Sequence, residues 1–141
     1  MREIKFRAWS SRLGIMSDYV TAIQNGDTQG TPSSVNVIVN GNNETWDIEH
    51  NNVILEQFTG LKDKNGKEIF KGSLVKYTEE DGESFIAEVK YFAKDGYPAF
   101  DVEPPNEFDF ESNVLSVGVA NNCLEVVGDI HNNHDLLEVS E

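Results

Sequence analysis

Short runs of alternating apolar and polar residues, separated by turn residues, recur along the chain and constrain its fold more than any other feature. In the opening run, Ile4, Phe6 and Ala8 fall on one face of an extended chain. A period of two places successive side chains on opposite faces, which predicts half-buried strands. Helical patterns are confined to two short stretches, residues 18–24 and 133–138. We therefore predict a mainly β fold with a short C-terminal helix.

The second half of the chain has a distinctive order of elements. A turn at Lys71-Gly72 precedes a strand that enters the core through Leu74 or Val75, and a polar loop and two long strands follow. This order resembles the small SH3-like barrels. With 141 residues, the chain has the size of one domain or of two small subdomains. We predict a single domain over residues 1–141, divided into a β-rich part, 1–58, and a part with a partly open SH3-like barrel, 59–141.

The stretch TGLKDKNGKEIFKGSLVKY, residues 59–77, combines glycines, lysines and acidic residues in the manner of a binding loop. It does not match a phosphate-binding P-loop, because five residues separate Gly60 from Gly66 and Glu68 stands where a hydroxyl residue is required. It does not match a calcium-binding EF-hand loop either, because leucine and glycine would occupy the first and last ligand positions.

The same stretch is well suited to turning the chain. Asn65-Gly66 predicts a two-residue hairpin turn in which both residues have positive φ. Lys71-Gly72 predicts a second turn before the next strand. We therefore assign a structural role in turns to Asp63, Asn65, Gly66 and Gly72.

Residues capable of catalysis or metal binding are present but do not form a recognised set. His131 and His134 are three positions apart and lack the cysteines that complete many zinc sites. Cys123 lies in an apolar stretch rather than in the basic surroundings that would activate a thiol. The carboxylates near Glu79 lie in a turn without an apolar pocket to separate their pKa values. We predict no catalytic, cofactor-binding or metal-binding residues, and no enzymatic activity.

Charge is distributed unevenly along the chain. The net charge of −14 arises from residues 78–141, because residues 1–77 hold nine Lys/Arg and nine Asp/Glu. An acidic surface of this kind favours solubility and disfavours binding to nucleic acid. The N-terminus is too charged for a secretory signal, no window is apolar enough to span a bilayer, and a single cysteine suits a reducing compartment. We expect a cytoplasmic protein that does not bind membranes.

Three segments carry a resemblance to a known family: MREIKFRAWS at the start, QFTGLKDKNGKEIFKGSLVKY in the centre and LEVVGDIHNNHDLLE at the end. Their order and spacing resemble the landmarks of the YopX family, small proteins encoded mostly by bacteriophages and prophages. The chain departs from the family pattern at Lys71, Ser73 and His131, where Glu, Asp and an aromatic residue are usual; a serine at position 73 still suits a turn. The resemblance implies a YopX-like domain, a bacterial cytoplasmic setting and self-association, and it supplies no catalytic residues.

These observations favour a non-enzymatic protein-interaction module that binds itself and an unidentified host or phage protein. The expected contact is the N-terminal strand, where a large aromatic stands among charges: Arg2, Lys5, Arg7 and Trp9. One alternative is a nucleic-acid-associated module that uses these residues together with Arg12, or the lysines at positions 62, 64, 67 and 71. Another is an acidic mimic of DNA that occupies a host DNA-binding protein.

The alternation also predicts the core. We expect burial of residues that lie on the apolar face of a strand or anchor a turn: Phe6, Leu61, Phe70, Val75, Val89, Tyr91 and Val126.

Replacement of Gly66 by valine is expected to lower the free energy of unfolding by about 1 kcal/mol or more, because a β-branched residue does not tolerate positive φ. A thermal melt of the variant beside the parent protein measures this effect. An unchanged melting temperature would contradict the predicted turn.

Overall fold

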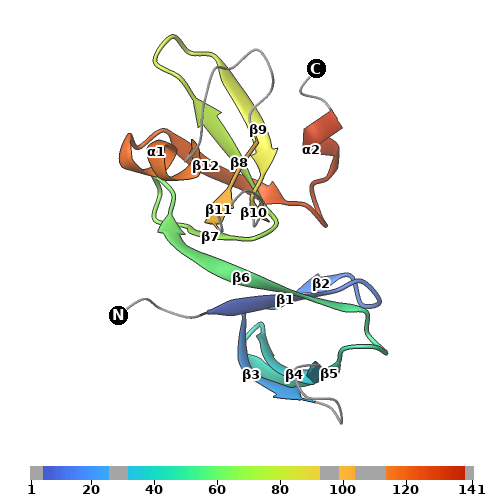
Figure 1. The fold of residues 1–141 in the computed structure, drawn as a ribbon. Coiled ribbons are helices and arrows are strands. Elements are labelled where there is room, and N and C mark those ends of the chain that lie inside the picture. Colours follow the sequence, from blue (N-terminus) through green and yellow to red (C-terminus); the bar gives the residue numbers. More distant parts are fainter. Residues whose placement is uncertain (1–4, 26–31, 93–98, 104–113, 139–141) are drawn as a thin grey trace. The chain divides into compact units, whose positions relative to one another are not determined.

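The structure is a computed structural model that describes residues 5–25, 32–92, 99–103 and 114–138 (Figure 1). The chain divides into two compact units, Met1–Phe58 and Thr59–Glu141. The boundary lies at the residue where the sequence analysis divided its two β-rich parts. The fold is mainly β, with two short helices in the described residues. Neither helix is long and apolar enough to cross a membrane.

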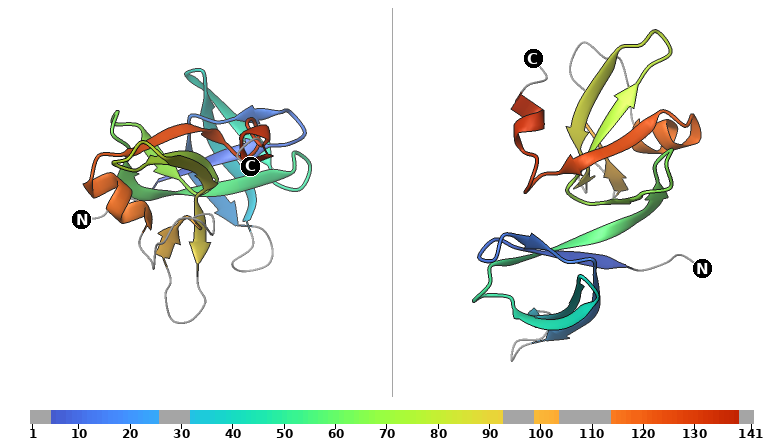
Figure 2. Two further views of the ribbon diagram at one scale, coloured as in Figure 1. Left: turned by 90° about the horizontal axis from the view of Figure 1, so that it is seen from above. Right: turned by 180° about the vertical axis from the view of Figure 1, so that it is seen from behind.

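The first unit consists of two antiparallel layers. The strands are β1 (Phe6–Ser10), β2 (Ile15–Met16), β3 (Tyr19–Asn25), β4 (Pro32–Val39), β5 (Asn42–Asp47) and the first part of β6 (Val53–Lys62). β1 pairs with β2 on one side and β6 on the other, and β4 pairs with β3 and β5. The view from behind in Figure 2 shows β4 and β5 curling, with β1 and β6 lying across them. The alternation of the sequence thus produces two sheets with facing apolar sides.

The core of the first unit lies between these sheets. Its buried members are Ala8 of β1, three alternate valines of β4 and Trp46 of β5. Four half-buried residues complete it: Val20, Ile48, Val53 and Leu55. Alternate residues of β4 point inward because a strand presents every second side chain to the same face.

The prediction of helical character near residues 18–24 is wrong, because this segment forms β3. Val20, Thr21 and Ile23 are β-branched, and such residues lose rotamer freedom in a helix but fit a pleated sheet. Pairing with β4 along the whole segment supplies backbone hydrogen bonds that an isolated seven-residue helix could not match.

The second unit is built around β8 (Ser73–Thr78), which pairs with β9 (Ser84–Glu88) and β12 (Leu124–Asp129). β6 runs on into this unit and pairs with β7 (Glu68–Phe70), while β10 (Lys90–Phe92) and β11 (Ala99–Asp101) form a separate pair. Two helices follow, α1 (Val114–Ala120) and α2 (Asp135–Glu138). α2 lies in the stretch where the sequence predicted a C-terminal helix.

Ten buried side chains form the core of the second unit, with Leu61, Phe100, Val119, Cys123 and Val126 packed against them. The buried set comprises Ile69, Val75, Tyr77, Phe85, Ala87, Val89, Val102, Val114, Leu115 and Leu124. Tyr77 and Phe85 face each other across β8 and β9 with their rings stacked at 5.4 Å between centroids. A stacked cross-strand pair of this kind stabilises the sheet beyond the burial of its two rings.

The helix α1 was not predicted from the sequence, because three valines and a glycine among its seven residues, VLSVGVA, have poor helix propensity. Its first turn is held by a distant residue, since Asp101 Oδ1 accepts a hydrogen bond from the Leu115 N–H at 2.9 Å. Gly118 faces Tyr77, where an added Cβ would lie 3.1 Å from the ring. Tertiary contacts therefore override local propensity here.

The predicted core is confirmed for Phe70, Val75 and Val89, which are buried. Phe6, Leu61 and Val126 are half-buried. The prediction for Tyr91 is wrong, because its side chain is 49% exposed and lies edge-on to Phe100. The alternation does not continue past β9: the Val89 N–H donates to the Ser73 carbonyl and the chain then enters the separate β10–β11 pair.

The turn after β12 is closed by side chains. Asp129 Oδ1 accepts hydrogen bonds from the N–H groups of His131 and Asn132, both at 2.9 Å, and Asn133 Oδ1 accepts from the Asp129 N–H at 3.1 Å. Asn133 thereby lies against Gly128, where an added Cβ would come within 2.4 Å of its Oδ1 atom. The glycine in the GDIHNNHD segment is therefore required by a side-chain contact.

Replacement of Gly128 by alanine is expected to lower the free energy of unfolding by about 1–3 kcal/mol, because the new methyl group forces Asn133 out of its hydrogen bond. Urea denaturation of the parent and the variant measures the loss. The same substitution made in an Asn133→Ala background should cost less, since the two nearest atoms, Oδ1 at 2.4 Å and Cγ at 2.5 Å, are gone and only Cβ at 2.8 Å remains. An equal loss in both backgrounds would show that this contact does not explain the glycine.

Candidate functional site

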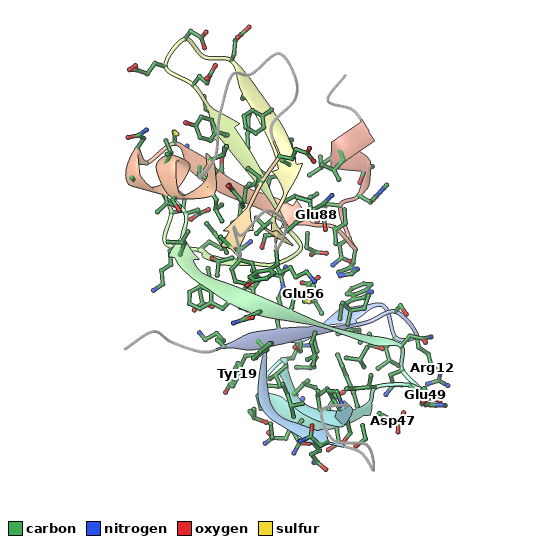
Figure 3. All side chains as sticks on the ribbon, viewed as in Figure 1. Arg12, Tyr19, Asp47, Glu49, Glu56 and Glu88 are labelled. Carbon is green, nitrogen blue, oxygen red and sulfur yellow. The ribbon has the colours of Figure 1, made fainter. Side chains whose placement is uncertain are left out.

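Arg7, one of the residues of the predicted interface on the N-terminal strand, forms an ion pair with another residue of the first unit. Arg7 and Glu56 are register partners on β1 and β6, and Arg7 Nε lies 2.7 Å from Glu56 Oε1. Their side chains are 14% and 4% exposed, so the pair is largely buried. Figure 3 labels Glu56 on β6. A hydrogen-bonded ion pair in this position neutralises the arginine, and losing either partner would leave an uncompensated buried charge. Arg7 is therefore not a free cation for an external partner.

Trp9 is buried, with 9% of its surface exposed. Little of its side chain is therefore left for the predicted contact with an external partner. β1 lies between β2 and β6 and is not an edge strand, and Ala8, Trp9 and Ser10 are all buried. Lys5 places its ammonium group 5.8 Å from the Phe58 ring centroid. Arg2 lies outside the described residues. Alternation identified the strand, but it did not predict that Trp9 is buried beside Ala8.

The predicted turn at Asp63 and Gly66 is built around one carboxylate. Asp63 Oδ1 accepts hydrogen bonds from the N–H groups of Asn65 at 2.9 Å and Lys67 at 2.8 Å. Asp63 Oδ2 accepts from the Val126 N–H at 2.8 Å. The Asp63 N–H donates to the Lys67 carbonyl, which closes the hairpin between β6 and β7. The structural role of Asp63 is therefore not confined to its own turn, because the same carboxylate also binds the backbone of β12.

The type of this turn differs from the prediction. Gly66 has a φ of +83°, as expected, but the non-glycine residues with positive φ in the described chain are Asn40, Asn52 and Asn122. Asn65 therefore keeps an ordinary backbone conformation. The hairpin has a three-residue loop that ends on a left-handed glycine, a common form that needs only one residue of positive φ. The Asp63 carboxylate favours this form because it binds the N–H two residues ahead.

The pKa of Asp63 is lowered from its ordinary value near 3.8. Burial alone would raise it, but hydrogen bonds from the backbone N–H groups of Val126, Lys67 and Asn65, with the nearby charge of Lys67, more than compensate. Each of these donors stabilises the ionised form. The carboxylate is therefore a fixed backbone acceptor and is not poised for proton transfer.

Gly72 and Ser73 form the second predicted turn. Gly72 is buried with a φ of +89°; its N–H donates to the Val89 carbonyl and its carbonyl accepts from the Ile130 N–H. Ser73 is buried, and its Oγ accepts a hydrogen bond from the Phe70 N–H at 3.0 Å. The serine at position 73 therefore caps the turn, as the sequence analysis allowed.

Three carboxylates gather at the tip of the β8–β9 hairpin. One carboxylate oxygen from each of Glu79, Asp81 and Glu83 lies within 4.8 Å of the others. Beside them is an open pocket of about 750 Å³ whose lining includes Tyr77, Asn121 and Cys123. Burial, followed by the influence of Cys123 and Glu79, raises the pKa of Tyr77. Three oxygens of this kind are suited to a hard cation, but they also occur on surfaces that bind none.

A second surface was missed by the sequence analysis. β3 is an edge strand of the β3–β4–β5 sheet, and six of its seven residues are exposed. Its sequence, YVTAIQN, contains no charged residue. Tyr19 and Ile23 belong to a set of seven exposed large apolar residues in the described chain, five of which lie in the first unit: Leu13, Ile15, Tyr19, Ile23 and Ile54. The sequence already shows that this segment lacks charge. Because the segment was interpreted as helical, it was not recognised as an uncharged edge strand.

Comparisons with known proteins agree with this fold. The family model of the YopX protein matches residues 5–138. The crystal structure of protein EF1440 from Enterococcus faecalis is similar, with a TM-score of 0.65 and 24% identity, covering 97% of this chain and 99% of that chain. At this level of identity, the likeness concerns the fold alone. No curated protein matches the chain.

Substitution of Asp63 by asparagine is expected to lower the free energy of unfolding by about 1.5–3 kcal/mol at pH 7, since an amide cannot accept hydrogen bonds on both sides. The folded pKa of Asp63 is lowered, so its contribution is complete above the unfolded pKa and disappears as pH falls through the folded pKa. Denaturation curves from pH 7 to pH 2 should therefore show the parent and the variant converging in acid.

Glu80→Gln is the matched control, because it removes one carboxylate from an exposed position. This variant should follow the parent across the same pH range. A difference between the parent and Asp63→Asn that stays constant down to pH 2 would contradict the role given to the ionised carboxylate.

Proposed function

Because the chain belongs to the YopX protein family, we propose that it is a non-enzymatic protein-interaction module of a phage or prophage, acting in the cytoplasm of a bacterial host. It binds other proteins through the exposed edge strand β3, and it binds a second copy of itself. The family resemblance supplies no catalytic residues.

One observation carries this proposal: the polar side chains of the family landmarks hold backbone groups rather than a reaction centre. Asp63, Ser73 and Asp129 each accept hydrogen bonds from backbone N–H groups. Catalytic acids and bases are usually found in clefts with pKa values suited to proton transfer. A carboxylate saturated by backbone donors does not meet that requirement. The landmarks therefore support the fold, and function is carried by the surface.

The exposed apolar residues of the first unit support binding to another protein. An edge strand presents unpaired N–H and C=O groups to its surroundings, and native proteins commonly protect such edges with charges. β3 lacks this protection, although the chain as a whole is rich in charge. Addition of an extended segment to a free sheet edge is a recurring mode of protein recognition. β3 has the features that this mode requires.

For the second unit we propose a partly open SH3-like barrel. β8 lies at its centre, with β9 and β12 on either side and the β6–β7 hairpin joined to β12 through Asp63. This architecture is used by many unrelated binding proteins, so it agrees with an interaction role without specifying a partner.

A mimic of DNA charge is the second candidate, and the cluster of Glu79, Asp81 and Glu83 at one hairpin tip favours it. Binding to nucleic acid itself is less favoured. Arg7 is paired with Glu56, and Arg12 lies beside the turn that carries Asp47 and Glu49, at the same end of the first unit (Figure 3). The lysines at positions 62, 64, 67 and 71 are exposed, but the second unit holds eighteen Asp/Glu against seven Lys.

Capture from a bacterial host lysate, with the tagged parent and two lysine variants, distinguishes these functions. Ile23→Lys places a charge on β3, and Thr45→Lys places the same charge on the exposed opposite edge, β5. We expect a specific partner to be retained by the parent and by Thr45→Lys in both low and high salt, and to be lost by Ile23→Lys, because strand pairing is little screened by salt.

Two results would contradict the use of β3 to bind a host protein: capture of no specific protein by the parent, or equal capture by all three proteins. A partner released by high salt and lost on Glu80→Lys and Asp81→Lys substitution would favour the mimic of DNA charge instead.

A further inference from the structure

We propose that β3 pairs with the β3 strand of a second copy of the chain, antiparallel and about a two-fold axis. This inference rests on the proposed function and names the partner of that same edge. The two copies of the β3–β4–β5 sheet would then form one continuous six-stranded sheet.

The first argument is the state of the edge. β3 pairs with β4 on one side, and in the described structure no strand pairs with its other side. Irregular positions lie between Val20 and Ala22 and between Gln24 and Asn25. The segment from Ala22 to Gln24 between them is regular and exposed. A strand that pairs with itself about a two-fold axis makes an isologous contact, in which each copy offers the same groups to the other.

The second argument is electrostatic. Two copies that each carry a net charge of −14 repel one another, so they meet most favourably where charge is least. The first unit holds four Lys/Arg and seven Asp/Glu, whereas the second holds seven Lys and eighteen Asp/Glu. β3 contains no charged residue. Its pairing with another β3 therefore brings together the two segments that repel least.

The distribution of charge also favours a second copy over other partners. A basic protein would be drawn to the carboxylates of the second unit, such as those at the β8–β9 tip, rather than to an uncharged edge. The opposite edge, β5, carries Glu44 and Asp47, and two such strands would place like charges in the contact. Like charges directly opposite each other destabilise a strand pair. Of the two edges of this sheet, β3 is the one suited to its own copy.

The side chains on β3 add apolar area to the backbone pairing. Tyr19 and Ile23 are exposed, and Thr21 and Gln24 bond to Asn36 of the neighbouring β4. These latter bonds fix polar side chains of β3 toward its own sheet. Ile23 is the register partner of the buried Val35 and Tyr19 that of Ile38, so these two side chains lie on opposite faces of β3. Antiparallel pairing about an axis near Ile23 brings the Ile23 side chains of the two copies together.

Light scattering after size exclusion is the primary test. At tens of micromolar, the full-length parent is expected to have twice the mass of a single chain, with little change between low and moderate salt. Ile23→Lys should raise the dissociation constant by roughly tenfold or more, because it places two like charges near the axis. Thr45→Lys on β5 is the matched control and should leave the dimer intact.

Disulfide trapping locates the contact. The chain has a single cysteine, so Cys123→Ser provides a background for Tyr19→Cys, Thr21→Cys or Ile23→Cys. In antiparallel self-pairing, the residue nearest the axis meets its own copy with Cα atoms about 4.5–5.5 Å apart, within the range of a disulfide. We expect a covalent dimer from at least one of these variants and none from Asn43→Cys on β5.

A parent protein with the mass of a single chain would overturn the self-pairing. So would covalent dimers from Asn43→Cys with none from the β3 cysteines. If Ile23→Lys still abolishes capture of a host protein in either event, the proposed function stands and only the identity of the partner is wrong. Failure of both experiments would overturn the two proposals together.

Discussion

Three backbone N–H groups converge on the carboxylate of Asp63, two from its own turn and one from Val126. A second link runs parallel to it, from the Lys64 N–H to the Leu124 carbonyl. The β6–β7 hairpin is thereby joined to β12, which pairs with the central strand β8. Because β12 begins directly after α1, the same connection fixes where the helix covers the core. The arrangement of the second unit thus depends on one charged group that cannot be replaced by an apolar residue.

The same use of acidic residues recurs in the second unit. Asp101 holds the first turn of α1 from β11, and Asp129 closes the turn between β12 and α2. Asp63 and Asp101 are buried, yet each has backbone donors within hydrogen-bond distance. This explains why these segments have the appearance of a binding motif: their polar side chains bind the protein's own backbone.

Local patterns predicted the strands and the glycine of the central turn, because these depend on neighbouring residues. The positive φ of Gly66 could be predicted from the Asn-Gly pair alone. The ordinary backbone conformation of Asn65, in contrast, depends on the carboxylate of Asp63 two positions earlier. Long-range contacts account for the errors. Trp9 is buried although it stands among charged residues in the sequence, and α1 forms although its valines disfavour a helix. β3 looked helical because its pairing with β4 is invisible locally. The uncharged edge, and with it the candidate surface, could be recognised only once that strand was placed.

The central claim is that the Asp63 carboxylate joins the hairpin to β12, and hydrogen exchange at the Val126 amide tests it most directly. Exchange protection reports local opening of the segment that carries a given N–H. In the parent, the Val126 amide should exchange slowly, and in Asp63→Ala it should exchange markedly faster, along with Asn65 and Lys67. Amides of β4 in the first unit serve as the internal reference and should not change. A Val126 amide that exchanges at the same rate in both proteins would contradict the account.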